Sequence, residues 1–347
     1  MNFHRYKAKL TKFIKKIILD QSQLNRYPMT PEAIIWGYRL FLDREPESQR
    51  MIEDKLRRLY STRDIRYEFL RSEEFKQRND GMASPALTGF EPPMTIDEVM
   101  SDDDLQLLFT HVQDTWQYLG EVEPHWSVIS ADNLKQTNLE DATINNFYES
   151  GKHDVARFIN TLERNGVDTS SFKLCLEYGC GLGRVTRWLA ERFEEVIGCD
   201  ISQSHLQYAK NYLSDEGIRN VTLRHLNTIE GIEDLLPVDV VYSIIVLQHN
   251  PPPIIELIIR NFIKTLKPGG VAYFQVPTYK LGYNFSLKDY LSGEAKHREI
   301  EMHYLPQKTV YEIVNQEGGQ ILEVLEDSWI HSHYYENSNT FLVQKRQ

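Results

Sequence analysis

Three glycines stand at alternate positions in the segment EYGCGLGR, residues 177–184, between an apolar run and a helix-like run. Glycine lets the backbone turn sharply and brings main-chain N–H groups close to a ligand. A helix expected to start near Leu182 would offer its positive end to an anionic group. A second apolar run ends at Asp200, whose carboxylate can accept hydrogen bonds from the two hydroxyls of a ribose. The segment therefore predicts a site for a nucleoside that bears a carboxylate or a phosphate.

Strand-like and helix-like runs alternate from residue 170 onward. The expected strands are 173–178, 195–199, 221–226, 238–247 and 271–276, and the expected helices include 185–193 and 204–213. Nearly continuous apolar strands that alternate with helices predict an α/β fold with a parallel sheet covered on both faces. Near the end of the chain, QILEVLED and NTFLVQKR are typical of two antiparallel strands. Ligands of such sheets bind beyond the carboxyl ends of the strands, where the glycine loop would lie.

The dinucleotide fingerprint G-x-G-x-x-G is the main alternative for this loop. Counting from Gly179, it requires a glycine at the position of Arg184, whereas the third glycine of this chain falls one residue earlier. A long side chain at that position would obstruct the close helix–strand packing that the fingerprint provides. Dinucleotide binding is therefore disfavoured.

The segments EYGCGLGR and VIGCDIS resemble the first two motifs of class I S-adenosylmethionine-dependent methyltransferases. VDVVYSIIVLQH is similar to the fourth strand of that family, LKPGGVAYFQVP to its fifth, and the C-terminal pair to its sixth and seventh. The resemblance covers roughly residues 145–347. It implies a Rossmann-like sheet of seven strands, one of them antiparallel, with helices on both faces. It also implies S-adenosylmethionine as the cofactor and methyl transfer as the activity.

The resemblance also assigns roles to individual residues around the loop. The residues expected along the methionine part of the cofactor are Gly179, Cys180, Gly181 and Gly183. Glu177 would anchor the loop and approach the amino group, and Asp200 would bind the ribose hydroxyls. Ile201 would pack on the adenine, with core packing as its alternative. Asn227 and Thr228, which follow the third strand, would lie near the adenine edge.

Two further segments are expected to contact the cofactor. Residues 243–246, including Ile244 and Val246, would form the floor under the sulfonium. The segment FYESGKHDVARF, which precedes the first strand, resembles a helix that covers the methionine end in similar methyltransferases, so Tyr148 and Gly151 are candidate contacts. For Val246, Tyr148 and Gly151 the alternative is simple packing.

His249 is the best-placed candidate for a general base. It lies just beyond the fourth strand, in VLQHNPPP. Methyl transfer from an activated sulfonium mainly needs alignment and desolvation, but an oxygen nucleophile also benefits from a base of near-neutral pKa. The alternative is a histidine that makes local hydrogen bonds at a helix start. Asn250 is expected to cap the following helix, which the prolines open.

The insert after the fifth strand, residues 278–306, is long and rich in aromatic residues, and loops of this length usually have a function. Tyr279, Tyr283 and His303 are expected to contribute to a substrate wall. The expected acceptor is a hydroxyl of a saccharide or glycan intermediate. The alternatives are an unrelated small metabolite, or a binding scaffold without turnover. No metal is expected, because no acid pair accompanies His331 and His333.

The N-terminal part predicts helices rather than an α/β unit. We expect a basic amphipathic helix in 1–27, a small all-α domain in 28–82, a linker and helical cap in 83–140, and the methyltransferase domain in 141–347. The stretch YRLFLDREPES…RYEFLRSEEF resembles a short domain of unknown function that is attached to bacterial polysaccharide-biosynthesis enzymes. The basic helix, at residues 3–18, would lie on an anionic membrane, on a partner protein, or on its own domain.

Charge and composition limit the possible partners. The net charge is −11, and six Lys/Arg without any acid in residues 1–18 leave −17 for the rest. An acidic body argues against nonspecific nucleic-acid binding. The three cysteines show no zinc spacing and suit a reducing compartment. No apolar run approaches the length of a membrane span, so we expect a cytoplasmic protein, with membrane association through residues 3–18 as an option.

Overall fold

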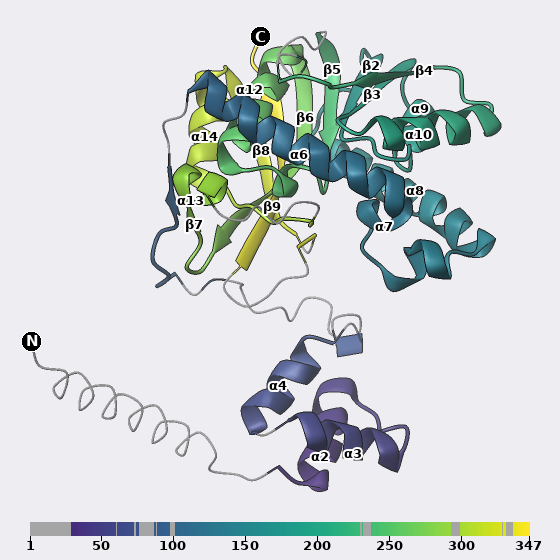
Figure 1. Ribbon diagram of the computed structural model, residues 1–347, viewed down its shortest axis with the longest axis vertical. Helices are drawn as coiled ribbons and strands as arrows, with labels where there is room; N and C mark the ends of the chain where they lie inside the picture. The colour runs from purple at the N-terminus through teal and green to yellow at the C-terminus, as the bar shows by residue number, and fades with distance from the viewer. Residues whose placement is uncertain are drawn as a thin grey trace, which may run out of the picture. The chain divides into compact units, whose positions relative to one another are not determined.

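The computed structural model of the 347-residue chain divides into two units, Met1–Pro85 and Ala86–Gln347 (Figure 1). It describes residues 29–59, 61–72, 74–75, 87, 89–97, 101–229, 231, 237–292, 299–327, 329–330 and 336–347. The expected basic helix at 3–18, part of the expected linker, and the histidines at 331 and 333 lie outside the described residues.

The first unit is helical, as expected. Its described helices are α2 (Pro31–Leu42), α3 (Gln49–Arg58) and α4 (Thr62–Leu70). The Thr30 side chain accepts a hydrogen bond from the Ala33 N–H at 3.2 Å, and Pro31 occupies the first helical position. The unit has its own hydrophobic core, which includes Ile34 and Phe69.

Within the described residues, seven strands of the second unit form one sheet. Side by side they are β4 (Val221–His225), β3 (Glu195–Asp200), β2 (Leu174–Tyr178), β5 (Val238–Ser243), β6 (Leu266–Lys280), β9 (Glu336–Lys345) and β8 (Gly319–Glu326). Neighbouring strands from β4 to β6 pair in parallel, whereas β9 runs antiparallel to both β6 and β8. The Rossmann-like sheet predicted from the sequence is confirmed. Its strand order reverses between β2 and β5, which places the switch point there.

Helices cover both faces of this sheet. The described helices of the unit are α6 (Asp102–Val122), α7 (Pro124–Val128), α8 (Asp141–Arg164), α9 (Thr186–Ala190), α10 (Gln203–Asp215), α12 (Pro252–Thr265), α13 (Leu287–Ser292) and α14 (Gln307–Gln316), with the 3-10 helices η1 (Asp132–Leu134), η2 (Gln136–Asn138) and η3 (Leu247–His249). On one face, α12 and α14 pack on alternate strand residues such as Leu176 and Val241. On the other, α8 and α9 pack on Cys175 and Val240. Successive side chains of a strand point to opposite faces of the sheet, and helices cover both faces, so the strands are apolar throughout.

Helix α6 lies in front of the sheet and contacts both α10 and α12 (Figure 1). It begins at Asp102, the first of three consecutive acidic residues. Ser101 and Asp104 form a reciprocal capping box, and the acids of the first turn face the positive end of the helix dipole. No helix in the described ranges combines the length and apolar character needed to cross a membrane.

Several boundaries of helices and strands differ from those predicted from the sequence. The helix expected at 185–193 starts at Thr186, close to that prediction, but it does not reach back to Leu182, because Gly183 has a φ of 81°, which a right-handed helix excludes. It is also shorter than expected, and hydrogen-bonded turns continue the chain to Phe193. Strand β5 ends at Ser243 rather than at residue 247, since Ile245 has a φ of 61°.

Strand β6 spans 266–280 rather than 271–276, because its pairing with β9 continues past Pro277 through a register shift. A two-residue parallel pair also joins β1 (Thr95–Ile96) to β7 (Asn284–Phe285). Neither short strand was predicted. The pair attaches the insert after β6 to the segment that precedes α6.

Candidate functional site

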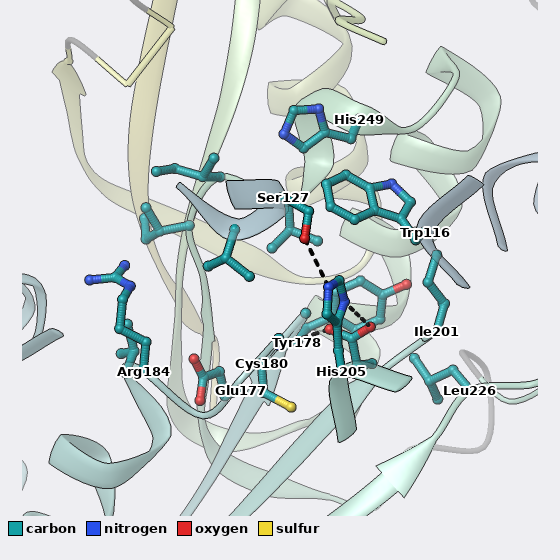
Figure 2. A pocket seen from close by; sticks show the side chains of 18 of the residues that line it. Trp116, Ser127, Glu177, Tyr178, Cys180, Arg184, Ile201, His205, Leu226 and His249 are labelled. Carbon is teal, nitrogen blue, oxygen red and sulfur yellow. Dashed lines mark hydrogen bonds and ion pairs between the residues drawn. The ribbon is translucent and has the colours of Figure 1, made fainter. Parts of the chain in front are cut away.

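A cavity opens beyond the carboxyl ends of the central strands, at the switch point of the sheet. The space among its lining residues is about 880 Å³, part of which is open solvent. Predicted residues that line it are Glu177, Gly179, Cys180, Gly181, Asp200, Ile201, Ile244, Val246 and His249. Figure 2 shows Arg184 and Glu177 toward one end, Ile201 and Leu226 toward the other, and His205 between them.

The glycine loop brings bare backbone to the cavity. Gly179 and Gly181 have φ values of 75° and 51°, a left-handed conformation that favours glycine. A Cβ on Gly179 would lie 2.5 Å from a methyl carbon of Val246, so any side chain there would collide with Val246. The N–H groups of Gly179 and Cys180 both donate to the Cys199 carbonyl, which ties the loop to the end of β3.

Asp200 is one of two buried acidic residues that line the cavity, the other being Glu177. One carboxylate oxygen accepts a hydrogen bond from the Gly181 N–H at 2.8 Å, and the other accepts one from the Ser202 N–H at 2.8 Å. The backbone therefore fixes the carboxylate in place and couples it to the glycine loop. Each oxygen keeps a lone pair for a further donor, which is what ribose hydroxyls supply.

Glu177 is the other buried carboxyl group that lines the cavity. Burial raises the pKa of Glu177 to about 8, against a smaller lowering by the hydrogen bond that the Thr186 hydroxyl donates at 2.5 Å. Few other donors offset the desolvation of the carboxylate. At neutral pH the group is therefore mainly the neutral acid, and a nearby cation would favour its ionisation.

Arg184 stands where the dinucleotide fingerprint requires glycine. Its guanidinium turns toward α8 and contacts the Asp154 carboxylate at 2.6 Å and the Ser150 hydroxyl at 3.1 Å. Its Nε is buried without a hydrogen-bond partner among the described residues. A buried donor of this kind suits an anionic group of a ligand in the cavity.

The cap helices supply a wall that the sequence did not predict. Trp116 of α6 and Ser127 and Val128 of α7 line the cavity. The Trp116 ring centroid lies 5.1 Å from that of His249 and 6.2 Å from that of His205 (Figure 2). One available signal was Gly120, since a glycine inside a helix often marks a close approach. A Cβ there would lie 2.6 Å from the Ser202 hydroxyl oxygen.

His249 is held by the insert after β6. Its Nδ1 lies 2.8 Å from the Glu301 carbonyl oxygen, which can only accept, so Nδ1 carries the proton. Burial lowers the pKa of His249 to about 4, despite this hydrogen bond. The imidazole is therefore neutral at physiological pH, with its lone pair on Nε2. This pKa is well below the near-neutral value expected from the sequence, so a proton-accepting role would be that of a weak base.

The turn after β5 contains strain and corrects one expectation. The positive φ of Ile245 is unfavourable for a β-branched residue, and its N–H donates to the Gln275 side chain at 3.1 Å. Asn250 was expected to cap α12, but that helix has no side-chain cap. The side-chain amide of Asn250 instead donates to the Val246 carbonyl at 2.9 Å, within the turn that lines the cavity.

Several predicted cofactor contacts lie outside the cavity lining. They are Tyr148, Gly151, Gly183, Asn227 and Thr228. The Tyr148 ring stacks on Tyr212 with centroids 3.5 Å apart. Gly151 lets α8 approach the glycine loop, since a Cβ there would lie 2.2 Å from the Arg184 carbonyl oxygen. For these two residues the packing alternative describes the contacts observed.

The predicted substrate residues belong to the insert. The Tyr279 hydroxyl donates to the Pro92 carbonyl at 2.7 Å, away from the cavity lining. Tyr283 and His303 are joined by a 2.9 Å hydrogen bond between the hydroxyl and Nδ1, and His303 Nε2 lies 3.2 Å from a carboxylate oxygen of Glu301. These two residues therefore connect through Glu301 to His249.

A smaller polar cavity adjoins the main one. We call it the annex; its lining residues are His111, Val112, Thr115, Trp116, His249, Glu299 and Glu301. Trp116 and His249 line both cavities. Burial alone would raise the pKa of Glu301, but hydrogen bonds from His111, His303 and Tyr290 lower it below its usual range. A carboxylate thus faces a small polar space beside His249.

The cysteines do not add reactive groups. Cys175, Cys180 and Cys199 are buried and free, and burial raises the pKa of each thiol above its ordinary value. A protonated thiol is a poor nucleophile and metal ligand. Among the described side chains, no group of three or more His, Cys, Asp or Glu residues is placed to hold a metal ion.

An open α/β sheet with a glycine loop and an acidic strand end at its switch point defines a nucleotide-binding class of fold. Within it, residues 175–270 match the family model described as a methyltransferase domain. The matched span runs from β2 into β6 and includes the glycine loop, Asp200 and His249. The second unit of the chain therefore contains a methyltransferase domain.

The chain is also similar to the ubiquinone biosynthesis O-methyltransferases of Idiomarina loihiensis and Pseudomonas fluorescens strain Pf0-1. It is 31% identical to the first over 131 residues, which cover 37% of this chain and 50% of that protein. It is 32% identical to the second over 121 residues, which cover 33% of this chain and 50% of that protein. The aligned part thus spans about half the length of these curated relatives.

Among solved structures, the chain is similar to magnesium protoporphyrin IX methyltransferase from Synechocystis PCC 6803 with bound SAH. The two are 18% identical, the match covers 68% of this chain and 99% of that chain, and the TM-score is 0.47.

Proposed function

We propose that this protein transfers a methyl group from S-adenosylmethionine to an oxygen acceptor. One observation carries the proposal: the glycine loop and the Asp200 carboxylate face one cavity at the switch point of the sheet, inside the span that matches a methyltransferase domain. When bound, this cofactor supplies an activated methyl group, so the protein mainly has to bind, align and desolvate the reactants.

The cavity has groups that suit each part of such a cofactor. Asp200 would accept hydrogen bonds from the ribose, and Ile201 and Leu226 would pack on the adenine from the apolar end. At the other end, the unpartnered Arg184 Nε would donate to the carboxylate of the methionine part. Glu177 would face the amino group, whose positive charge favours the ionised carboxylate.

His249 would act on the acceptor rather than on the cofactor. Its Nδ1 proton is held by the Glu301 carbonyl, so Nε2 is the nitrogen that can accept a hydrogen bond from a hydroxyl. The Gln248 amide nitrogen lies 3.2 Å from the same Nε2 and would have to yield to the acceptor. Because its pKa is about 4, His249 would orient the hydroxyl and assist removal of its proton only as that proton becomes acidic during transfer.

The acceptor that we propose is a hydroxyl of a saccharide or glycan intermediate. Two features support this choice. The annex beside His249 has polar groups on most of its walls, including Thr115 and Glu301, and hydroxylated ligands satisfy such groups. The first unit also resembles helical domains attached to bacterial polysaccharide-biosynthesis enzymes. Tyr283 and His303 would then shape the wall behind the annex.

A phenolic or other small metabolite is the second candidate. The observation in its favour is the similarity to proteins named for ubiquinone biosynthesis. A flat acceptor would contact Trp116, whose ring borders both cavities. A scaffold that binds the cofactor without turnover is a third candidate, and the intact site weighs against it.

Calorimetry with purified full-length protein tests the cofactor assignment. We expect S-adenosylhomocysteine and S-adenosylmethionine to bind, and NADH not to bind at the same concentrations. Binding of NADH alone would refute the proposal.

A turnover assay that detects S-adenosylhomocysteine formation tests the acceptor class. We expect product with a panel of nucleotide sugars or oligosaccharides, and none with catechols. Product with catechols alone would move the assignment to the second candidate. Cofactor binding without turnover on both panels would favour the scaffold.

A further inference from the structure

His205 is a buried residue of the cavity to which the proposed function gives no role. It lies on α10, its side chain is almost completely buried, and its ring faces the cavity between the ends described above (Figure 2). Nε2 lies 2.9 Å from the Ser127 hydroxyl oxygen on α7. Nδ1 lies 3.9 Å from a carboxylate oxygen of Asp200. The ring thus stands between the cap and the carboxylate at the end of β3.

The Ser127 contact determines which nitrogen of His205 carries the proton. The Ser127 hydroxyl oxygen lies 2.8 Å from the Pro124 carbonyl oxygen. Two oxygens that close need a hydrogen between them, and a carbonyl has none, so the hydroxyl donates to Pro124. The Ser127 oxygen must therefore accept from His205, which puts a proton on Nε2. In the neutral ring, the lone pair is then on Nδ1.

That lone pair faces another acceptor. The distance of 3.9 Å from Nδ1 to Asp200 is too long for a direct hydrogen bond. Both oxygens of Asp200 already accept a backbone N–H, and each has a further lone pair that can accept another hydrogen bond. Two acceptors side by side at the edge of a cavity are stabilised by two neighbouring donors. A vicinal diol, such as that of a ribose, supplies two hydroxyl hydrogens in this arrangement.

We propose that His205 is a second ribose-binding residue: Nδ1 accepts a hydrogen bond from one ribose hydroxyl while Asp200 accepts one from the other. Ser127 is a positioning residue that fixes the required tautomer and links the cap to the bound nucleoside. This inference rests on the proposed function, because it needs a ribose in the cavity. It makes the cap part of nucleoside recognition.

The test is calorimetry with S-adenosylhomocysteine and its 2′-deoxy and 3′-deoxy analogues. His205→Gln is the informative variant, because its amide nitrogen can keep the donor to Ser127 while the Nδ1 acceptor is lost. We expect a roughly three- to tenfold loss of affinity for S-adenosylhomocysteine, the range of one hydrogen bond. One deoxy analogue lacks the hydroxyl that Nδ1 would bind. For that analogue, the affinity of His205→Gln should equal that of the wild type.

Ser204→Ala is the matched control. Its hydroxyl accepts from Gln117 at 2.8 Å, so it also joins α10 to the cap, but it does not line the cavity. Its affinity should equal that of the wild type. Ser127→Ala should lose less affinity for S-adenosylhomocysteine than His205→Gln does. Thermal melting of each variant checks that the fold is retained, and histidine nitrogen NMR of the wild type reads the tautomer directly.

The outcomes separate the two proposals. If the wild type binds no S-adenosylhomocysteine, the proposed function fails. If the wild type binds, but His205→Gln has unchanged affinity or loses equally toward both analogues, the ribose role of His205 is wrong. A proton found on Nδ1 rather than Nε2 would also overturn it, since Nδ1 would then donate toward Asp200.

Discussion

The cavity has two walls that are built in different ways. The strand wall consists of Glu177, the glycine loop, Asp200 and Val246, and is fixed by backbone conformation and by hydrogen bonds to main-chain groups. The cap wall consists of Trp116, Ser127 and Val128, and is held by side chains, such as the contact between Ser127 and His205. Backbone constraints leave little freedom, whereas a few side-chain hydrogen bonds can be exchanged at modest cost.

This difference predicts that substitutions in the two walls have different effects. Substitutions in the strand wall should abolish nucleoside binding or destabilise the fold, because each group there contributes both to the binding site and to the stability of the fold. Substitutions in the cap wall should produce graded changes.

Asp200→Ala should weaken binding of S-adenosylhomocysteine by about 4 kcal/mol, or roughly a thousandfold. The variant loses a carboxylate that orders the Gly181 N–H and that would bind the ribose, and hydrogen bonds to charged groups contribute about 1.5–3 kcal/mol each. Titration calorimetry measures the change. A loss below tenfold would mean that the carboxylate has no direct contact with the ligand.

Asp239→Ala is the control for that experiment. Asp239 is also a buried carboxylate, and it accepts hydrogen bonds from the Lys173 and Leu174 N–H groups at 3.0 and 2.9 Å. It does not line the cavity. The variant should lose stability as Asp200→Ala does, but it should keep its affinity for S-adenosylhomocysteine.

Gly179→Ala should reduce the free energy of unfolding by about 3 kcal/mol, because it combines an unfavourable positive φ with a collision against Val246. Gly217→Ala is the comparison. Gly217 has a similar φ of 71°, but nothing lies within 4 Å of its added Cβ, so only about 1 kcal/mol should be lost. Denaturant titration of both variants gives the difference. Equal losses would show that Gly179 and Val246 do not approach each other closely enough to exclude a side chain at position 179.

Sequence predicts the strand wall because its signals are local. Glycines at alternate positions and an acid at a strand end are adjacent in the chain to the elements that they join, so Gly179, Gly181 and Asp200 could be named in advance. The cap wall has no comparable pattern. Trp116 and Ser127 belong to helices whose position depends on long-range packing, and no local rule states which helical face turns toward the cavity.

The same reason explains the predicted contacts that lie elsewhere. Tyr148 was placed near the cofactor from its position before the first strand, but stacking on Tyr212 turns its ring away from the cavity lining. His249 lines the cavity, as its position just beyond the fourth strand predicts, whereas its low pKa arises from burial, which outweighs the hydrogen bond to the Glu301 carbonyl. Burial of a titratable group is a property of the folded chain and has no single-residue signature.

Glu177 should make the stability of the protein depend on pH. Its unfolded-state pKa is 4.5 and its folded-state pKa is raised to about 8, so the folded chain binds more protons between these values. Stability should therefore fall as pH rises through this window, by about 2 kcal/mol from pH 6 to pH 8. Glu177→Gln should remove this slope in urea titrations at the two pH values. An identical slope in both proteins would place the folded-state pKa near its ordinary value.

His249→Gln should give the smallest effect, a roughly tenfold loss of turnover with unchanged affinity for S-adenosylhomocysteine. A base whose pKa is about 4 accelerates proton removal less than one matched to neutral pH, so its loss also costs less than is usual for a general base. The folded His249 stays neutral down to about pH 4, so turnover should show no inflection from this group between pH 6 and 8. Steady-state kinetics with an acceptor found in the panel above would measure both. A loss of cofactor affinity in this variant would instead show that His249 contacts the bound nucleoside. Its proposed role on the acceptor would then be wrong.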